Sequence, residues 1–189
     1  INAGGRIGNS ELGVYLLKGT DEFKSIEIAN KLDDLNKKRR LLTSELEKSV
    51  IGQIEKNINI NNNVTPNIIV VSGKNFHEGI IGIVAGRMKE LYNRPVCIIA
   101  VSTDGVCKGS GRSVNGVPLG DLILEASKLK ITSSGGGHDM AAGFTIKEDK
   151  IDEFSEFLIN KVNLLMNKVI PKVIHFAASV IPISGCTLE

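Results

Sequence analysis

The sequence predicts an α/β fold, with a mixed β-sheet that is flanked by helices and preceded by a long connecting helix. Residues 20–57 contain no proline and a single glycine, and their apolar side chains recur at helical spacing. Two short β-branched runs within residues 67–101 enclose a helical stretch, an order that predicts two parallel strands joined by a crossover. A tight turn at residues 102–105 then leads into a strand of opposite direction, so the predicted sheet is mixed.

Composition indicates a soluble globular protein. The chain has 189 residues, of which 42% are hydrophobic and 23% charged, enough for one good-sized core with appendages. A net charge of +2 is too small to indicate a polyanionic partner, so any nucleic-acid-binding surface must be confined to one part of the molecule. Cys97, Cys107 and Cys186 form no C-x-x-C pair, which argues against a disulfide framework and a zinc site and favours a reducing cytoplasm.

The ends of the sequence predict a fragment of a longer protein. The chain opens at Ile1 without a methionine and stops at Glu189 without a natural ending. No apolar run approaches the length of a membrane span, and no signal peptide is visible, so no membrane partner is expected.

Residues 1–63 are predicted to form a glycine-rich turn and the connecting helix. Ser10 can cap a short helix that ends near Leu17, and a second helix begins near Asp21. At 1.5 Å per residue this second helix would be roughly 50 Å long, the length of a strut between domains. Its apolar stripe consists of Leu35, Leu42, Leu46, Val50 and Ile54.

Four consecutive cations, Lys37 to Arg40, interrupt the connecting helix. At 100° per residue they point all round the helix, so at least one or two face away from the apolar stripe. The simplest function of the run is solubility. The alternative is contact with a nucleic-acid backbone that passes between domains.

Residues 64–168 are predicted to be the main domain, after an asparagine-rich linker at residues 57–66. Its expected strands cover residues 67–72, 94–101, 108–113 and 140–146, and its expected helices cover residues 78–92, 119–129 and 148–166. Gly79, Gly82 and Gly86 fall on roughly one face of the first helix. Because each glycine costs about 1 kcal/mol there, we expect the sheet to pack very close to all three.

The stretch around Gly135, Gly136 and Gly137 is the first candidate site. It reads I-T-S-S-G-G-G-H-D-M-A-A-G-F from residue 131. Glycines without a Cβ let backbone N–H groups approach a ligand, which suits an anion or a base. We expect a turn with His138 at the mouth of the following strand, although most glycine runs are structural loops.

A polar row on one strand is the second candidate. The sequence K-G-S-G-R-S begins at residue 108, and strand alternation places Lys108, Ser110 and Arg112 on one face and small residues on the other. An arginine can grip a phosphate in bidentate fashion, and a serine can donate to it. A solvated edge strand would show the same row.

Four motifs in order resemble one known family. They are I-N-A-G-G-R-I-G at residue 1, N-F-H-E-G-I-I-G-I-V-A-G-R-M at residue 75, G-S-G-R-S at residue 109, and G-G-G-H with M-A-A-G from residue 135. Together they resemble the C-terminal substrate-binding domain of the Asp-His-His phosphoesterase superfamily. Within it, the chain resembles the RecJ family of single-stranded-DNA-specific 5′→3′ exonucleases. The likeness runs from Ile1 to about Val162, and Gly4 departs from the alanine usual in that family.

The resemblance implies a role in DNA repair and recombination, with single-stranded DNA as the partner. The substrate-binding residues it implies hold the 5′ phosphate or the terminal nucleotide; they are Asn2, Arg6, His77, Ser110, Arg112, Gly135, Gly136, Gly137 and His138. Manganese or magnesium would be held by an upstream Asp-His-His domain, because this chain has no Asp-His-His motif. We therefore expect no catalytic residues or metal ligands here, and no DNA cleavage by this chain alone. Residues 169–189 would begin an oligonucleotide-binding barrel.

Two other interpretations stay open. One is an oligoribonuclease of the same superfamily that also dephosphorylates adenosine bisphosphate, although such enzymes lack the connecting helix and the barrel. The other is a non-catalytic nucleic-acid-binding module, like the C-terminal domain of alanyl-tRNA synthetase. Nucleotide binding through a P-loop or a dinucleotide fold fails because the sequence contains neither motif.

Overall fold

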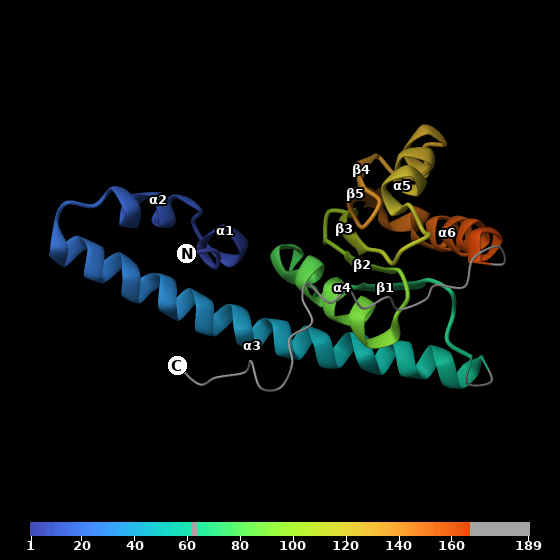
Figure 1. Cartoon of the computed structure of the whole chain (residues 1–189), viewed down its shortest axis with the longest axis horizontal. Helices are drawn as coiled ribbons and strands as arrows, with labels where there is room; N and C mark the ends of the chain where they lie inside the picture. The colour runs from blue at the N-terminus through green and yellow to red at the C-terminus, as the bar shows by residue number, and fades with distance from the viewer. Residues whose placement is uncertain (62–63, 167–189) are drawn as a thin grey trace, which may run out of the picture.

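The fold is organised around one five-stranded mixed sheet. The computed structural model describes residues 1–61 and 64–166. The strand order is β1-β2-β3-β5-β4, in which β1 and β2 are parallel and every other neighbouring pair is antiparallel. The predicted fold class is confirmed (Figure 1). The strands are β1 (Ile69–Gly73), β2 (Val96–Ala100), β3 (Val106–Arg112), β4 (Ser134–His138) and β5 (Ala141–Lys147).

The glycine run is a strand, where the sequence predicted a turn. Residues Ser134–His138 pair with β5 along the edge of the sheet. A Cβ at Gly135 would lie 2.6 Å from a methyl carbon of Ile123, so the missing side chain lets a helix pack directly on this strand. Glycine usually weakens a strand, and this close helix packing is the compensating reason for it here.

Two short helices precede the long one. They are α1 (Gly4–Ile7) and α2 (Glu11–Lys18), followed by α3 (Glu22–Ile60). Ser10 is the N-cap residue of α2 as predicted, but its side chain makes no capping hydrogen bond. The Asn9 side chain instead accepts a hydrogen bond from the backbone N–H of Glu11 at 2.8 Å. Asp21 caps α3 by accepting from the N–H of Lys24, and the helix continues into the asparagine-rich segment predicted as linker.

The other helices cover the two faces of the sheet. They are α4 (Glu78–Tyr92), α5 (Leu119–Lys128), the short 3-10 helix η1 (Glu148–Lys150) and α6 (Ile151–Met166). One core lies between the sheet, α5 and α6, and includes Phe144, Phe154 and Ile123. The second lies between the sheet, α4 and the C-terminal half of α3, and includes Val50, Val84 and Ile98. Arg87 of α4 also pairs with Glu47 of α3 at 2.5 Å.

The three glycines of α4 lie in different surroundings, and only one of them packs closely on the sheet. A Cβ at Gly79 would overlap the carbonyl oxygen of Arg6, so α1 and not the sheet packs at this point. A Cβ at Gly82 would lie 2.9 Å from the Ser110 hydroxyl, which is the predicted contact with the sheet. Nothing lies within 4 Å of a Cβ at Gly86, so the expectation of close packing was wrong there.

Two further expectations concern cysteines and membranes. Cys97 and Cys107 are buried and free, and burial raises the pKa of the Cys97 thiol to about 12, so it stays protonated. None of the helices in the described part of the chain has the combination of length and apolar character that a bilayer crossing needs. Cys186 and the predicted barrel strand at residues 169–189 lie outside the described residues.

Candidate nucleic-acid interface

The polar row on β3 faces away from the core that α5 and α6 form. On the opposite face, a Cβ at Gly109 would overlap the Phe144 ring, and one at Gly111 would lie 2.5 Å from Leu119. These contacts leave no room for larger residues on that face. Lys108 is exposed and Ser110 is half-buried, so alternation along the strand gives the polar face that the sequence predicted.

Three rows of residues continue this polar face across β5 to β4. Directly paired residues in an antiparallel sheet point to the same side. The three rows, each read from β3 through β5 to β4, are Lys108-Thr145-Ser134, Ser110-Gly143-Gly136 and Arg112-Ala141-His138. Helix α4 covers β2 and the beginning of this face, while Gly143 stays exposed. The small residues of β5 therefore leave an open floor.

A groove of about 470 Å³ lies over this floor. Arg6 enters it from α1, and its Nη1 lies 3.5 Å from the carbonyl oxygen of Gly79 at the start of α4. The helices α1 and α4 and the strands β3, β4 and β5 thus contribute to one concave surface. The lining residues are Gly5, Arg6, Glu78, Gly79, Ile81, Lys108, Gly109, Ser110, Ser134, Gly135, Gly143, Phe144 and Thr145.

The groove carries cations that the fold does not neutralise. Within the described residues, Arg6 and Lys108 of the groove form no ion pair with a carboxylate, and neither does Arg112, which lies behind the groove. Lys108 Nζ donates instead to the Thr145 hydroxyl at 3.0 Å. Glu78 is the one acidic residue that lines the groove. The balance of charge favours an anionic ligand.

Arg112 lies behind the groove and does not line it. Its Nη1 donates to the Ser110 hydroxyl at 3.3 Å and to the carbonyl of Gly111 at 2.8 Å, and its Nη2 lies next to Gly82. The half-buried guanidinium therefore touches the groove through Ser110.

Not all the predicted site residues share this groove. Arg6, Ser110 and Gly135 line it, whereas His138 and Gly137 line a separate hollow of about 450 Å³ beside the start of α5. His138 is nevertheless on the same side of the sheet as Arg112, because Ala141 pairs with both. Gly136 lies between the two hollows on β4, and Asn2 lines a third cavity that also contains Arg6.

His77 has a structural role at the start of α4. It is the N-cap residue of α4, and its Nδ1 accepts a hydrogen bond from the backbone N–H of Gly79 at 3.0 Å. The accepting nitrogen is therefore occupied, and only Nε2 is left for a ligand. The substrate-side role that the resemblance implies for His77 stays a prediction.

Sequence reasoning missed several groove residues. Lys108 was placed in the polar row but not among the site residues, and the predicted site residues also do not include Gly143, Thr145, Ser134 and Glu78. A signal for two of them was present. Alternation along the strand from Ala141 places Gly143 and Thr145 on one face, opposite buried Ala142 and Phe144.

The described residues offer no metal centre. Nowhere in residues 1–61 and 64–166 do three histidine, cysteine, aspartate or glutamate side chains gather as ligands for a metal ion. Glu78 and His77 are neighbours at the start of α4, but the imidazole Nδ1 is engaged by the helix cap. A catalytic metal pair needs such a cluster of ligands, and residues 1–61 and 64–166 do not form one.

Comparison with known proteins gives the class of the domain. Residues 65–164 match the family model described as the DHHA1 domain, which is more than half of the chain. The chain belongs to the DHHA1 domain family, and the matched residues include β1 to β5 and the helices α4, α5 and most of α6.

The particular relatives are RecJ proteins. The chain is 34% identical over 158 residues to the single-stranded-DNA-specific exonuclease RecJ of Dickeya dadantii. The aligned segment covers 82% of this chain and 27% of that protein. Identity to RecJ of Escherichia coli is 33% over the same length, with the same coverage. The chain thus spans about a quarter of the length of these curated relatives.

Solved structures agree with this likeness. The structure of Thermus thermophilus RecJ in complex with Mn²⁺ matches with a TM-score of 0.75 and 27% identity, over 87% of this chain and 23% of that one. The complex with Mg²⁺ from the same organism gives a TM-score of 0.73 at 26% identity. The resemblance to the RecJ family is therefore confirmed.

Proposed function

We propose that this chain is the C-terminal part of a RecJ-like exonuclease that degrades single-stranded DNA from its 5′ end, in DNA repair and recombination. Its groove would hold the 5′ phosphate or the terminal nucleotide. One observation carries the proposal: Arg6, Lys108 and Ser110, which are far apart in the sequence, converge on one groove with an exposed glycine floor. The single-stranded-DNA-specific relatives support the choice of ligand.

The groove chemistry fits the charged end of a nucleic-acid strand. Arg6 and Lys108 supply positive charge, Ser110 supplies a hydroxyl donor, and Arg112 stands behind Ser110. The bare backbone of Gly135 and Gly136 lies beside them, and Gly137 and His138 continue the same strand toward the neighbouring hollow. The remaining proposed contacts are Asn2, which precedes α1 and lines the cavity that adjoins the groove at Arg6, and His77, the N-cap of α4 next to Glu78 and Gly79 of the groove.

Bond cleavage would depend on residues outside this chain. We place the Mn²⁺ or Mg²⁺ ions in an upstream Asp-His-His domain, because the described residues contain no fitting ligand cluster and the chain spans 27% of its relative. The partners of this chain would then be that domain, a downstream oligonucleotide-binding barrel and single-stranded DNA, in the cytoplasm. The chain alone would show no exonuclease activity with manganese.

A binding experiment tests the proposal. We expect the chain to bind a short 5′-phosphorylated oligothymidylate more tightly than the same oligonucleotide with a 5′ hydroxyl. Arg112→Ala removes a charged donor next to Ser110 and should reduce the affinity for the phosphorylated form by about tenfold. Fluorescence anisotropy titrations with both oligonucleotides measure this preference.

The matched control is Arg87→Ala, which removes an arginine from α4 that pairs with Glu47 on α3. It should bind both oligonucleotides as the wild type does. Equal affinity for the two oligonucleotides in the wild type would contradict a phosphate grip. A preference for transfer RNA without dependence on a 5′ end would favour the non-catalytic binding module instead.

A further inference from the structure

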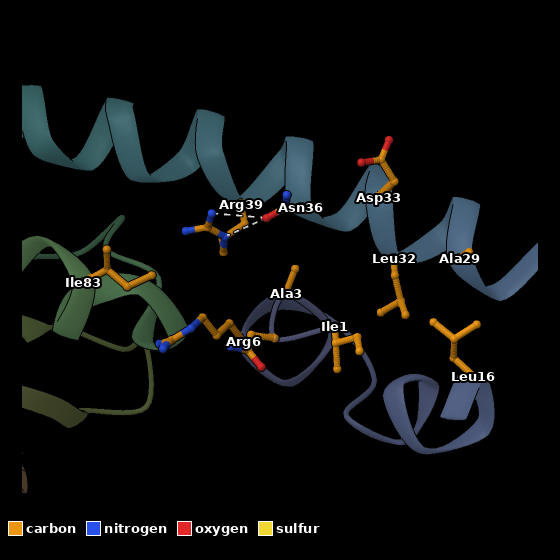
Figure 2. A pocket seen from close by; sticks show the side chains of 11 residues that line it. Ile1, Ala3, Arg6, Leu16, Ala29, Leu32, Asp33, Asn36, Arg39 and Ile83 are labelled. Atoms are coloured by element: carbon orange, nitrogen blue, oxygen red, sulfur yellow. Dashed lines mark hydrogen bonds between the residues drawn. The ribbon is translucent and has the colours of Figure 1, made fainter. Parts of the chain in front are cut away.

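A second cavity adjoins the groove through a shared residue. It has a volume of about 870 Å³ and lies between α1, α3 and α4, and Arg6 lines both hollows. Figure 2 shows Arg39 entering from α3 and Arg6 from α1, on opposite walls of the cavity. The other lining residues are Ile1, Asn2, Ala3, Leu16, Ala29, Leu32, Asp33, Asn36 and Ile83.

Arg39 differs from the other cations of its run. Its Nε and Nη2 both donate to the Asn36 side-chain oxygen, at 3.3 and 3.2 Å, and the side chain is partly buried. Lys37, Lys38 and Arg40 are exposed. The side chain of Asn36 therefore fixes one guanidinium of the run against the cavity, while Nη1 has no acceptor among the described residues.

The charge in the cavity is not balanced by the fold. Asp33 lines the wall, but its carboxylate pairs with Lys37 at 2.9 Å, and this hydrogen bond and charge lower the pKa of Asp33. Within the described residues, Arg39 and Arg6 have no carboxylate partner. Arg39, held by Asn36, and Arg6, whose Nη1 lies 3.5 Å from the carbonyl oxygen of Gly79, both line the cavity. Such a pair suits a phosphate, which arginine binds through paired hydrogen bonds.

We propose that this cavity is a second phosphate subsite and that Arg39, positioned by Asn36, binds a phosphate that follows the terminal one. The nucleic-acid strand would pass from the groove over Arg6 and then along α3, so that the long helix is a contact surface as well as a strut. This inference rests on the proposed function, since it assumes that the 5′ end occupies the groove.

The test compares Arg39→Gln with Arg40→Gln, which removes the neighbouring exposed cation and is the matched control. Affinity for a 5′-phosphorylated oligothymidylate is measured by anisotropy over a series of salt concentrations. We expect Arg39→Gln to weaken binding about tenfold, and to reduce the slope of log affinity against log salt by about 0.7, the value of one phosphate contact on a single strand. Arg40→Gln should retain the wild-type slope.

Two further arms locate the contact. Thymidine 5′-monophosphate, which has only the terminal phosphate, should compete equally well for wild type and Arg39→Gln but poorly for Arg112→Ala. Asn36→Ala should weaken oligonucleotide binding in the wild type and have no added effect in Arg39→Gln, because it acts through Arg39.

Distinct outcomes overturn the two proposals. If Arg39→Gln and Arg40→Gln reduce the affinity and the slope of log affinity against log salt equally, the helix contributes only a diffuse electrostatic attraction and there is no subsite. An Arg39→Gln protein that binds like the wild type, while Arg112→Ala is impaired, would overturn the subsite and leave the groove intact. If the wild type binds the 5′-phosphorylated and the unphosphorylated oligonucleotide with equal affinity, the proposed function itself is overturned.

Discussion

The two faces of the sheet at β3 and β5 use small residues in opposite ways. Toward α5 and α6, Gly109 lies under the Phe144 ring and Gly111 lies under Leu119, so each missing side chain is replaced by an aromatic or aliphatic one. On the other face, the nearest atom to a Cβ at Gly143 is 3.9 Å away, and the space above it is the groove. Glycine therefore serves packing on the closed face and access on the open face.

Substitutions on the two faces should therefore affect different properties of the protein. Changes on the closed face should lower the free energy of unfolding, because they create cavities or overlaps in a dense core. Changes on the open face should leave stability nearly unchanged and alter affinity for the ligand. Paired substitutions of the same chemistry can test whether the two properties divide along the sheet.

The largest effect is expected for Phe154→Ala. Phe154 is fully buried, and its ring centroid lies 4.6 Å from that of Phe144. Truncation should lower the free energy of unfolding by about 3 to 5 kcal/mol, measured by urea denaturation. Phe23→Ala is the control, since Phe23 is 87% exposed on α3 and should cost less than about 0.5 kcal/mol. Similar losses in the two variants would contradict the assignment of the core.

An intermediate effect is expected for the two glycines of the comparison. Gly109→Ala places a methyl group against the Phe144 ring and should cost about 1 to 3 kcal/mol in unfolding experiments. Gly143→Ala meets no atom closer than 3.9 Å and should stay within about 0.5 kcal/mol of the wild type.

Ligand affinity should show the reverse order. The Gly143→Ala methyl group extends into the groove beside Ser110, so affinity for a 5′-phosphorylated oligonucleotide should fall roughly tenfold, equivalent to about 1.4 kcal/mol. Anisotropy titration measures this change. If Gly143→Ala binds normally while folded Gly109→Ala does not, the open face is not the ligand surface.

Periodicity and local signals predicted the elements well. The helix at residues 78–92 and the alternation of Lys108, Ser110 and Arg112 were correct because they depend on local spacing. The strand state of Gly135 to Gly137 was missed, since glycines have no strand preference and only their pairing with β5 and contact with Ile123 hold them extended.

The division of the candidate site into separate hollows could not be predicted from the sequence. Whether His138 shares a cavity with Ser110 depends on the packing of α5 against the end of β4, which no local signal encodes. The same is true of Arg39, whose difference from Arg40 lies in its contact with Asn36 and the position of α1. Long-range packing decides which side of a helix meets a cavity.

The smallest effect is expected at His77, the N-cap residue of α4, which lies next to the groove residues Glu78 and Gly79. His77→Ala removes the acceptor for the Gly79 N–H and should lower stability by about 1 kcal/mol in urea denaturation. His77→Ser supplies a hydroxyl that can cap the same helix, so stability should return to near the wild-type value. Failure of serine to restore stability would contradict the capping role.

Once serine has restored the cap, binding by His77→Ser isolates any contact between the imidazole and the ligand. Because Nδ1 is occupied by the cap and His77 does not line the groove, the contact is limited to Nε2 at its margin, and we expect affinity for the phosphorylated oligonucleotide to fall by less than about threefold. A loss as large as that of Arg112→Ala would place His77 among the principal ligand contacts. In that case the residues that determine ligand affinity would include the start of α4 as well as the open face of the sheet.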